Sequence, residues 1–242
     1  MAGHSHWAGI KHKKGRADKE RSKIFSKLSK EITVAAKLGD KDPDMNPRLR
    51  TAIQAAKQAN MPKDNISRAI SKSEMSGDKN YESLRYEGFG PSNVALIIET
   101  LTDNKNRSAS SIRTVLQKRG GRLGESGSTT HMFTNCGIIH FDKKKINEDK
   151  IFEIAINAGA KDCLSLDNIF EIITKKEDFY KIKTELEKNT ETFTYSSVEW
   201  RPLNYLDLTK EQSEQILETL SALEELDDVQ SIFTNANLKN LQ

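Results

Sequence analysis

A row of basic side chains in residues 16–37 has the type and spacing needed to bind a polyanion. On a helical wheel of about 100° per residue, these side chains lie within about 40° of one line. They form a ridge about 31 Å long at the rise of an α-helix. This basic ridge consists of Arg16, Lys19, Lys23, Lys27, Lys30 and Lys37. Neutralisation of phosphates by such residues releases condensed counterions, which favours binding to nucleic acids.

A row of lysines can also be an ordinary solvent-exposed helix face. In this ridge, however, acidic residues do not alternate with the basic ones, because Glu20 and Glu31 flank it. Like charges at this spacing repel each other by roughly 0.3 kcal/mol per pair, and a bound polyanion would relieve that repulsion. We therefore expect a ridge without counterions that binds phosphates, with a solvated face as the alternative.

The residues before the ridge add imidazoles, lysines and one indole ring. Such side chains stack on bases and donate hydrogen bonds to phosphates. The candidate nucleic-acid contacts in this tail are His4, His6, Trp7, Lys11, His12, Lys13 and Lys14. Packing of Trp7 onto the following helices is the alternative to a direct contact. We expect no metal or other cofactor, because no Cys, Asp or Glu lies nearby to complete a ligand shell and the lysines would repel a cation.

The chain is divided into a basic and an acidic part. Residues 1–80 hold 18 Lys and Arg against 9 Asp and Glu, whereas the other 162 residues hold 20 against 26. This asymmetry indicates two surfaces with different partners. In the acidic part, the last predicted helix ends in a group of acidic residues: Glu224, Glu225, Asp227 and Asp228. These carboxylates are either a solvated face or a group that keeps this part of the chain away from phosphates.

Apolar periodicity predicts three helices in the first 80 residues. The first runs over residues 16–38 and ends at Gly39. A second begins at Asn46-Pro47, where Asn caps the helix and Pro occupies its first turn. A third begins at Met61-Pro62, and the polar residues 73–80 form a linker. Short connections between three helices indicate a small bundle.

The remaining residues alternate between predicted strands and helices. Strands are expected at 94–101, 129–133, 137–141, 163–166, 169–174, 193–200, 205–208 and 229–234, and helices at 106–119, 147–158, 177–188 and 210–226. Residues 137–200 then form a ferredoxin-like βαββαβ unit, and residues 94–133 with 203–234 form a second one. The predicted fold is α+β: a bundle in domain 1–80, followed by two ferredoxin-like units, with domain 135–202 inserted into domain 81–134 plus 203–238.

Other segments offer weaker signals of chemistry. Residues 103–107 lie between a strand and a helix, where they either cap the helix or bind an anion through Lys105 and Arg107. The glycine-rich residues 120–127 follow a helix, which indicates a turn, since phosphate loops run from strand to helix. Cys136 and Cys163 are expected to be reduced thiols without a chemical role. No catalytic constellation, membrane span or secretion signal is found, so we expect a cytoplasmic protein that is not an enzyme.

Many ordered motifs between residue 1 and about residue 238 resemble the YebC/PmpR family. They are Gly3-His4-Ser5-His6-Trp7, Ile10-Lys11-His12-Lys13-Lys14, Lys23-Ile24-Phe25, Glu31-Ile32-Thr33-Val34-Ala35-Ala36, Asp42-Pro43-Asp44, Asn46-Pro47-Arg48-Leu49-Arg50, Asn60-Met61-Pro62-Lys63-Asp64, Tyr86-Glu87-Gly88-Phe89-Gly90-Pro91, Leu101-Thr102-Asp103-Asn104-Lys105-Asn106-Arg107 and Leu226-Asp227-Asp228-Val229-Gln230. The chain departs from the usual pattern at His6, where Lys is common, and at Gly9, where Asn is common.

The resemblance implies a helical N-terminal domain, two α+β domains with one inserted in the other, and a regulator of gene expression that is not an enzyme. Members are usually described as probable transcriptional regulators that bind DNA, and relatives include a mitochondrial translational activator that acts on the ribosome. The implied partners are DNA or ribosomal RNA, with the transcription machinery or the ribosome. Arg48 and Arg50 join the candidate nucleic-acid contacts. A protein-interaction module built on the acidic units is the alternative, and no small-molecule substrate is expected.

Overall fold

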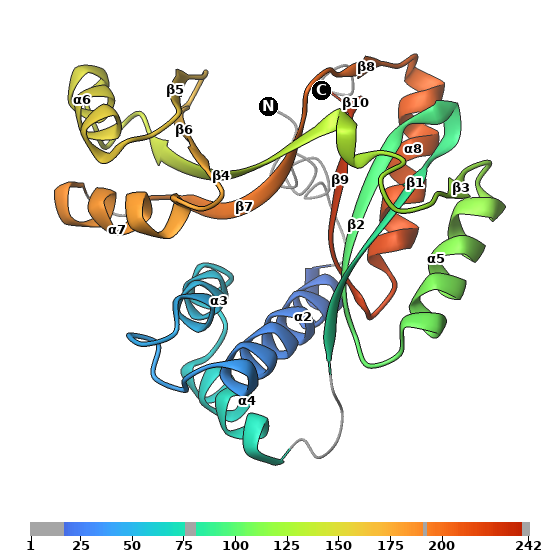
Figure 1. Ribbon diagram of the computed structural model, residues 1–242, viewed down its shortest axis with the longest axis horizontal. Coiled ribbons are helices and arrows are strands. Elements are labelled where there is room, and N and C mark those ends of the chain that lie inside the picture. Colours follow the sequence, from blue (N-terminus) through green and yellow to red (C-terminus); the bar gives the residue numbers. More distant parts are fainter. Residues whose placement is uncertain (1–16, 76–80, 191–192, 239–242) are drawn as a thin grey trace.

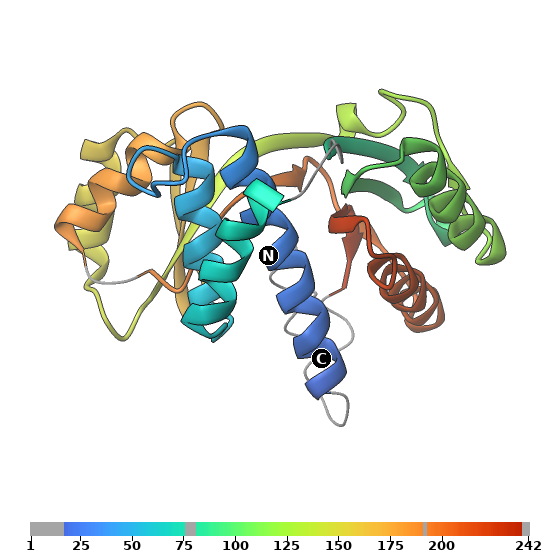
Figure 2. The same ribbon diagram turned by 90° about the horizontal axis from the view of Figure 1, so that it is seen from below.

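The structure, a computed structural model, describes residues 17–75, 81–190 and 193–238. The fold is α+β, with N-terminal helices and two four-stranded sheets (Figure 1). The helices of the bundle lie in the angle between the two sheets and their covering helices (Figure 2). Among the described residues, every helix is too short or too polar to traverse a lipid bilayer.

The N-terminal bundle consists of α2 (Ala17–Leu38), α3 (Pro47–Gln58) and α4 (Lys63–Met75). The predicted Asn46 cap is confirmed, because its side chain accepts a hydrogen bond of 3.0 Å from the backbone N–H of Leu49. The buried apolar side chains of the bundle include Ile32, Leu49 and Ile66, and they pack against other bundle residues. The three predicted helices therefore share one small hydrophobic core.

The first sheet has the strand order β3-β1-β2-β9. Its strands are β1 (Glu82–Phe89), β2 (Ala95–Thr102), β3 (Arg122–Leu123) and β9 (Val229–Thr234), with the short helix η1 (Pro91–Asn93) between β1 and β2. Helices α5 (Lys105–Lys118) and α8 (Lys210–Glu224) cover one face of this sheet (Figure 1). Leu96 and Ile98 of β2 pack there against Ile112 and Ile216, which places the core on the helix side.

Three strand predictions for this part of the chain are corrected by the structure. Strand β1 was not predicted, yet it pairs with both β2 and β3. Between Glu82 and Glu87 only Leu84 and Tyr86 are apolar, so the period-2 signal is short. The predicted strand 129–133 is instead the turn η2 (Thr130–Met132). Strand β8 (Leu206–Asp207) pairs with β10 (Ala236–Asn237) in a separate two-stranded sheet.

The second sheet confirms the predicted βαββαβ unit. Its elements are β4 (Phe133–Asp142), α6 (Glu148–Ala158), β5 (Asp162–Ser165), β6 (Ile169–Lys175), α7 (Phe179–Asn189) and β7 (Tyr195–Pro202), and the strand order is β5-β6-β4-β7. Gly159 ends α6 in the left-handed conformation, with φ of 86°. Ile139 and Phe141 of β4 pack against Ile151 of α6 and Phe179 of α7, so both helices cover the same face.

The two long strands β4 and β7 connect the two sheets (Figure 1). They pair from Phe133↔Pro202 to His140↔Tyr195 without an interruption of register. At the end near the first sheet, Phe133 packs with Ala95, Ile97 and Phe233. A continuous ribbon and a shared apolar cluster therefore hold the inserted unit to the rest of the fold.

Gly137 of β4 lies under the ring of Phe179, where no side chain fits. A Cβ atom at this position would lie 2.3 Å from Cδ2 of Phe179 and 2.3 Å from Oγ1 of Thr174, and both residues are fully buried. We expect Gly137→Ala to lower the free energy of unfolding by about 1–3 kcal/mol through overpacking. Urea denaturation measures this effect. Thr134→Ala, on the same strand and partly exposed, should change stability by less; equal stability of Gly137→Ala and the wild type would contradict the prediction.

Candidate nucleic-acid interface

Two lysines of the basic ridge line a groove between the bundle and both sheets. The groove has a volume of about 1030 Å³. Lys23 and Lys27 of α2 and Arg48 of α3 line its bundle side. The other side is formed by β1, β2 and β9, by β7, and by the end of α8. Lys23 and Lys27 therefore face this groove.

The expectation that the ridge has no counterions is wrong at two of its lysines. Nζ of Lys23 lies 3.4 Å from a carboxylate oxygen of Glu225, and Nζ of Lys30 lies 3.0 Å from Oδ1 of Asp228. These partners are about 200 positions away in the sequence. The spacing of charges within α2 therefore gave no indication of them, because it reports only on acids of the same helix.

The other ridge and tail candidates divide between described and undescribed residues. Lys27 and Lys37 are half-buried, and each takes part in a further interaction. The backbone of Lys19 lies in the first turn of α2, but its side chain is outside the described part of the chain. The remaining candidates also lie outside it: His4, His6, Trp7, Lys11, His12, Lys13, Lys14 and Arg16. The structure therefore places four of the six ridge side chains.

The two arginines of α3 have intramolecular partners. Nε and Nη2 of Arg48 donate hydrogen bonds of 2.7 and 3.1 Å to the two carboxylate oxygens of Glu31. This bidentate pair raises the pKa of Arg48 above its ordinary value and links α3 to α2. Nη1 of Arg50 lies 3.5 Å from the backbone carbonyl of Asp44. Both arginines thus contribute to the structure of the bundle.

The turn between α8 and β9, residues 224–228, is the acidic turn. Its last residue, Asp228, accepts hydrogen bonds through Oδ2 from Ser108 Oγ at 2.7 Å, Arg107 Nη2 at 2.8 Å and Thr102 Oγ1 at 3.1 Å. Oδ1 accepts the bond from Lys30. Partial burial opposes ionisation, but the hydrogen bonds from Arg107, Ser108 and Lys30 outweigh it and lower the pKa of Asp228 to about 2. The carboxylate is therefore charged at neutral pH.

Residues 103–107 were expected either to cap helix α5 or to bind an anion, and in the structure they cap the helix. The side chain of Asn104 accepts a hydrogen bond of 3.0 Å from the backbone N–H of Arg107. The guanidinium of Arg107 is held by Asp103 and Asp228, each at 2.8 Å. Lys105 is exposed. Asp228 thus occupies the position that an external anion would take beside Arg107.

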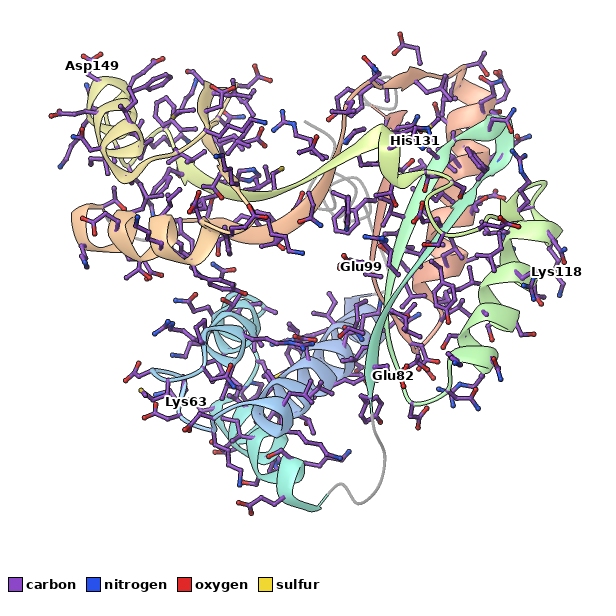
Figure 3. The ribbon with its side chains drawn as sticks, viewed as in Figure 1. Lys63, Glu82, Glu99, Lys118, His131 and Asp149 are labelled. Atoms are coloured by element: carbon purple, nitrogen blue, oxygen red, sulfur yellow. The ribbon has the colours of Figure 1, made fainter. Side chains whose placement is uncertain are left out.

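The sheet side of the groove carries aromatic and charged groups. The guanidinium of Arg85 lies 4.8 Å from the ring centroid of Trp200, and the Trp200 Nε1–H donates a hydrogen bond of 2.9 Å to Glu99. Glu99 lies on the side of β2 that faces α2 and β7 (Figure 3). Tyr180 and Tyr195 also line the groove. These residues were not predicted as site residues, because only the fold brings β1, β2 and β7 together.

A second polar cluster lies within the inserted sheet. Nε2 of His140 is 3.1 Å from one carboxylate oxygen of Glu171, and the other oxygen accepts a hydrogen bond of 2.6 Å from Arg201.

The two cysteines are not reactive thiols. Cys136 is buried, and burial raises the pKa of its thiol. Burial also raises the pKa of Cys163, to about 11. Neither thiol is activated as a nucleophile. Within the described residues, no group of three or more His, Cys, Asp or Glu side chains is arranged to hold a metal ion.

Comparison with known proteins identifies the class of protein that this fold defines. A family model described as the TACO1/YebC protein N-terminal domain matches residues 5–76, and a model described as the TACO1/YebC second and third domain matches residues 81–236. The chain belongs to the TACO1/YebC family. The family resemblance predicted from the sequence motifs is thereby confirmed.

Relatives in several bacteria are similar over nearly their whole length. A protein of Pelagibacter ubique (strain HTCC1062), named a probable transcriptional regulatory protein, is 58% identical over 240 residues, which are 99% of this chain and 100% of the relative. A protein of Zymomonas mobilis with the same description is 48% identical over 98% of this chain and 96% of the relative. The crystal structure of a conserved hypothetical protein from Aquifex aeolicus superposes with a TM-score of 0.82, at 42% identity and 96% coverage of both chains. The curated relatives are thus named as probable transcriptional regulatory proteins.

Proposed function

We propose that this protein is a non-enzymatic regulator of gene expression that binds nucleic acid through the basic ridge of α2. The observation that carries the proposal is the alignment of Lys23, Lys27 and Lys30 at helical spacing in the part of the chain that has a large excess of Lys and Arg. The names of the relatives support a role in transcription. The residues that precede α2 in the sequence include further lysines and histidines.

Lysines on a ridge contact phosphates, and phosphate contacts position a protein without reading the base sequence. We therefore expect weak sequence preference. Duplex DNA is the target that the relatives' names favour, and structured RNA is the alternative that the same chemistry allows. Fluorescence anisotropy with a labelled duplex DNA and with a structured RNA of equal length, competed by unlabelled DNA and RNA of other sequences, distinguishes the two targets.

The proposed contacts predict a steep dependence of affinity on salt. If about six basic residues contact phosphates, the slope of log affinity against log salt concentration should be about −5 for duplex DNA. Titrations at several concentrations of sodium chloride measure this slope. A slope near zero would show that phosphates do not drive the interaction and would contradict the proposal.

A further inference from the structure

Two of the carboxylates of the acidic turn contact lysines of the ridge. Lys23 and Lys30 are seven residues apart, so they lie two helical turns apart on the same side of α2. Glu225 contacts the first and Asp228 the second. Carboxylate and phosphate oxygens are both anionic acceptors for a lysine ammonium group. The acidic turn and a nucleic acid therefore require the same side chains.

The bundle is joined to the rest of the molecule by polar contacts. Its apolar cluster contains only bundle residues, separate from the clusters of the two sheets. Besides the two ion pairs, Arg48 lies 3.4 Å from Ser83 of β1, and Gln54 of α3 lies 3.2 Å from Glu187 of α7. Contacts of this kind between parts of one chain permit relative motion. Among the described residues, the bundle and the first sheet therefore share no cluster of buried apolar side chains.

The acidic turn remains stable when the lysines leave it. Asp228 keeps its hydrogen bonds to Thr102, Arg107 and Ser108, all from the first sheet and α5. The side chain of Glu225 is 61% exposed, so water solvates its carboxylate. Loss of the lysines thus leaves no buried charge without a partner, which is the usual cost of breaking an ion pair.

We propose that the acidic turn is an internal competitor for the basic ridge, and that nucleic acid displaces it as the bundle moves away from α8 and β9. This inference rests on the proposed function. With the bundle docked, the turn neutralises Lys23 and Lys30. A phosphate backbone gains access to Lys23 and Lys30 only by replacing Glu225 and Asp228. The turn therefore lowers affinity for all nucleic acids and favours those that contact the whole ridge.

The first test compares two double variants that remove the same charge, one from the acidic turn and one from the exposed face of α8. Glu224→Gln/Glu225→Gln removes carboxylates of the acidic turn, whereas Glu214→Gln/Glu218→Gln removes exposed carboxylates elsewhere on the helix. Binding of both variants and the wild type to a fluorescein-labelled duplex DNA, roughly two helical turns long, is measured by anisotropy at about 0.1 M salt. We expect the first variant to bind roughly 3- to 10-fold tighter than the wild type and the control less than about twofold tighter.

The second test follows the position of the bundle. Nitroxide labels are attached to Lys57→Cys on α3 and Lys118→Cys on α5, both exposed, in a chain with Cys136→Ala and Cys163→Ala. Addition of the DNA should lengthen the distance measured by electron paramagnetic resonance. If the wild type binds DNA while both double variants bind equally well and the distance is unchanged, the inference is overturned and the proposed function stands. Absence of DNA binding by every chain would overturn both.

Discussion

Replacing Lys23, Lys27 and Lys30 together by glutamine is expected to weaken binding to duplex DNA about 100-fold at roughly 0.15 M salt. Each lost phosphate contact removes about 0.9 released counterion, so the slope of log affinity against log salt should become shallower by about 3. The fold should persist, because Asp228 keeps Arg107, Ser108 and Thr102 as partners when Lys30 is removed. Anisotropy titrations at several salt concentrations measure both quantities.

The matched control removes the same charge from the same bundle. Lys57, Lys63 and Lys72 are exposed on α3 and α4, and none belongs to the basic ridge. Their replacement by glutamine should weaken binding only through the change in net charge, with a slope close to that of the wild type. Equal losses in the two triple variants would show that general positive charge, rather than the ridge, binds the nucleic acid.

Replacing Glu87 by glutamine is expected to destabilise the first sheet strongly at neutral pH. Glu87 is 3% exposed, and its carboxylate accepts hydrogen bonds from the backbone N–H groups of Gly127, Thr129 and Thr130 at 2.9, 2.8 and 2.8 Å. Burial opposes ionisation, but these bonds outweigh it and lower the pKa of Glu87 to about 2. The shift from an ordinary value of 4.5 corresponds to about 3 kcal/mol of stability.

The pH dependence of this contribution gives the measurement. Because the pKa is lower in the folded state, the stabilisation is complete above the ordinary pKa of 4.5 and is lost as the pH falls towards 2. Urea denaturation at about pH 7 should show Glu87→Gln about 2–3 kcal/mol less stable than the wild type, and the difference should shrink as the pH falls below 4.5. Glu82→Gln, exposed on the same strand, should be neutral. A constant difference at all pH values would contradict this origin of the stability.

Local signals predicted those parts of the fold in which the chain contacts its own near neighbours. The Asn46 cap, the Gly159 stop and the βαββαβ order of the inserted unit are all found in the structure. Strand β1 was missed because its stability depends on distant partners: Glu87 is buried by the loop at 127–130 rather than by its own strand. A carboxylate that is buried in this way looks, in sequence, like a solvent-exposed residue.

The same limit applies to the candidate site. The alignment of Lys23, Lys27 and Lys30 on one face follows from helical geometry, and the sequence predicted it. The pairing of Lys23 with Glu225 and of Lys30 with Asp228 depends on how the bundle docks, which no local pattern encodes. The sequence offered two interpretations of Asp228, a solvated face or a group that keeps this part of the chain away from phosphates. In the structure its carboxylate accepts hydrogen bonds from Thr102, Arg107 and Ser108 in addition to Lys30.

The pairing of Phe133 with Pro202 has a consequence for how the inserted unit is joined to the rest of the fold. The chain enters and leaves the inserted unit at two neighbouring positions on adjacent strands. Because these two positions are adjacent, a tight turn in place of the inserted unit would reconnect the rest of the fold, the host, without moving its other strands. The continuous pairing of β4 with β7 would then fix the orientation of the inserted unit on the host fold.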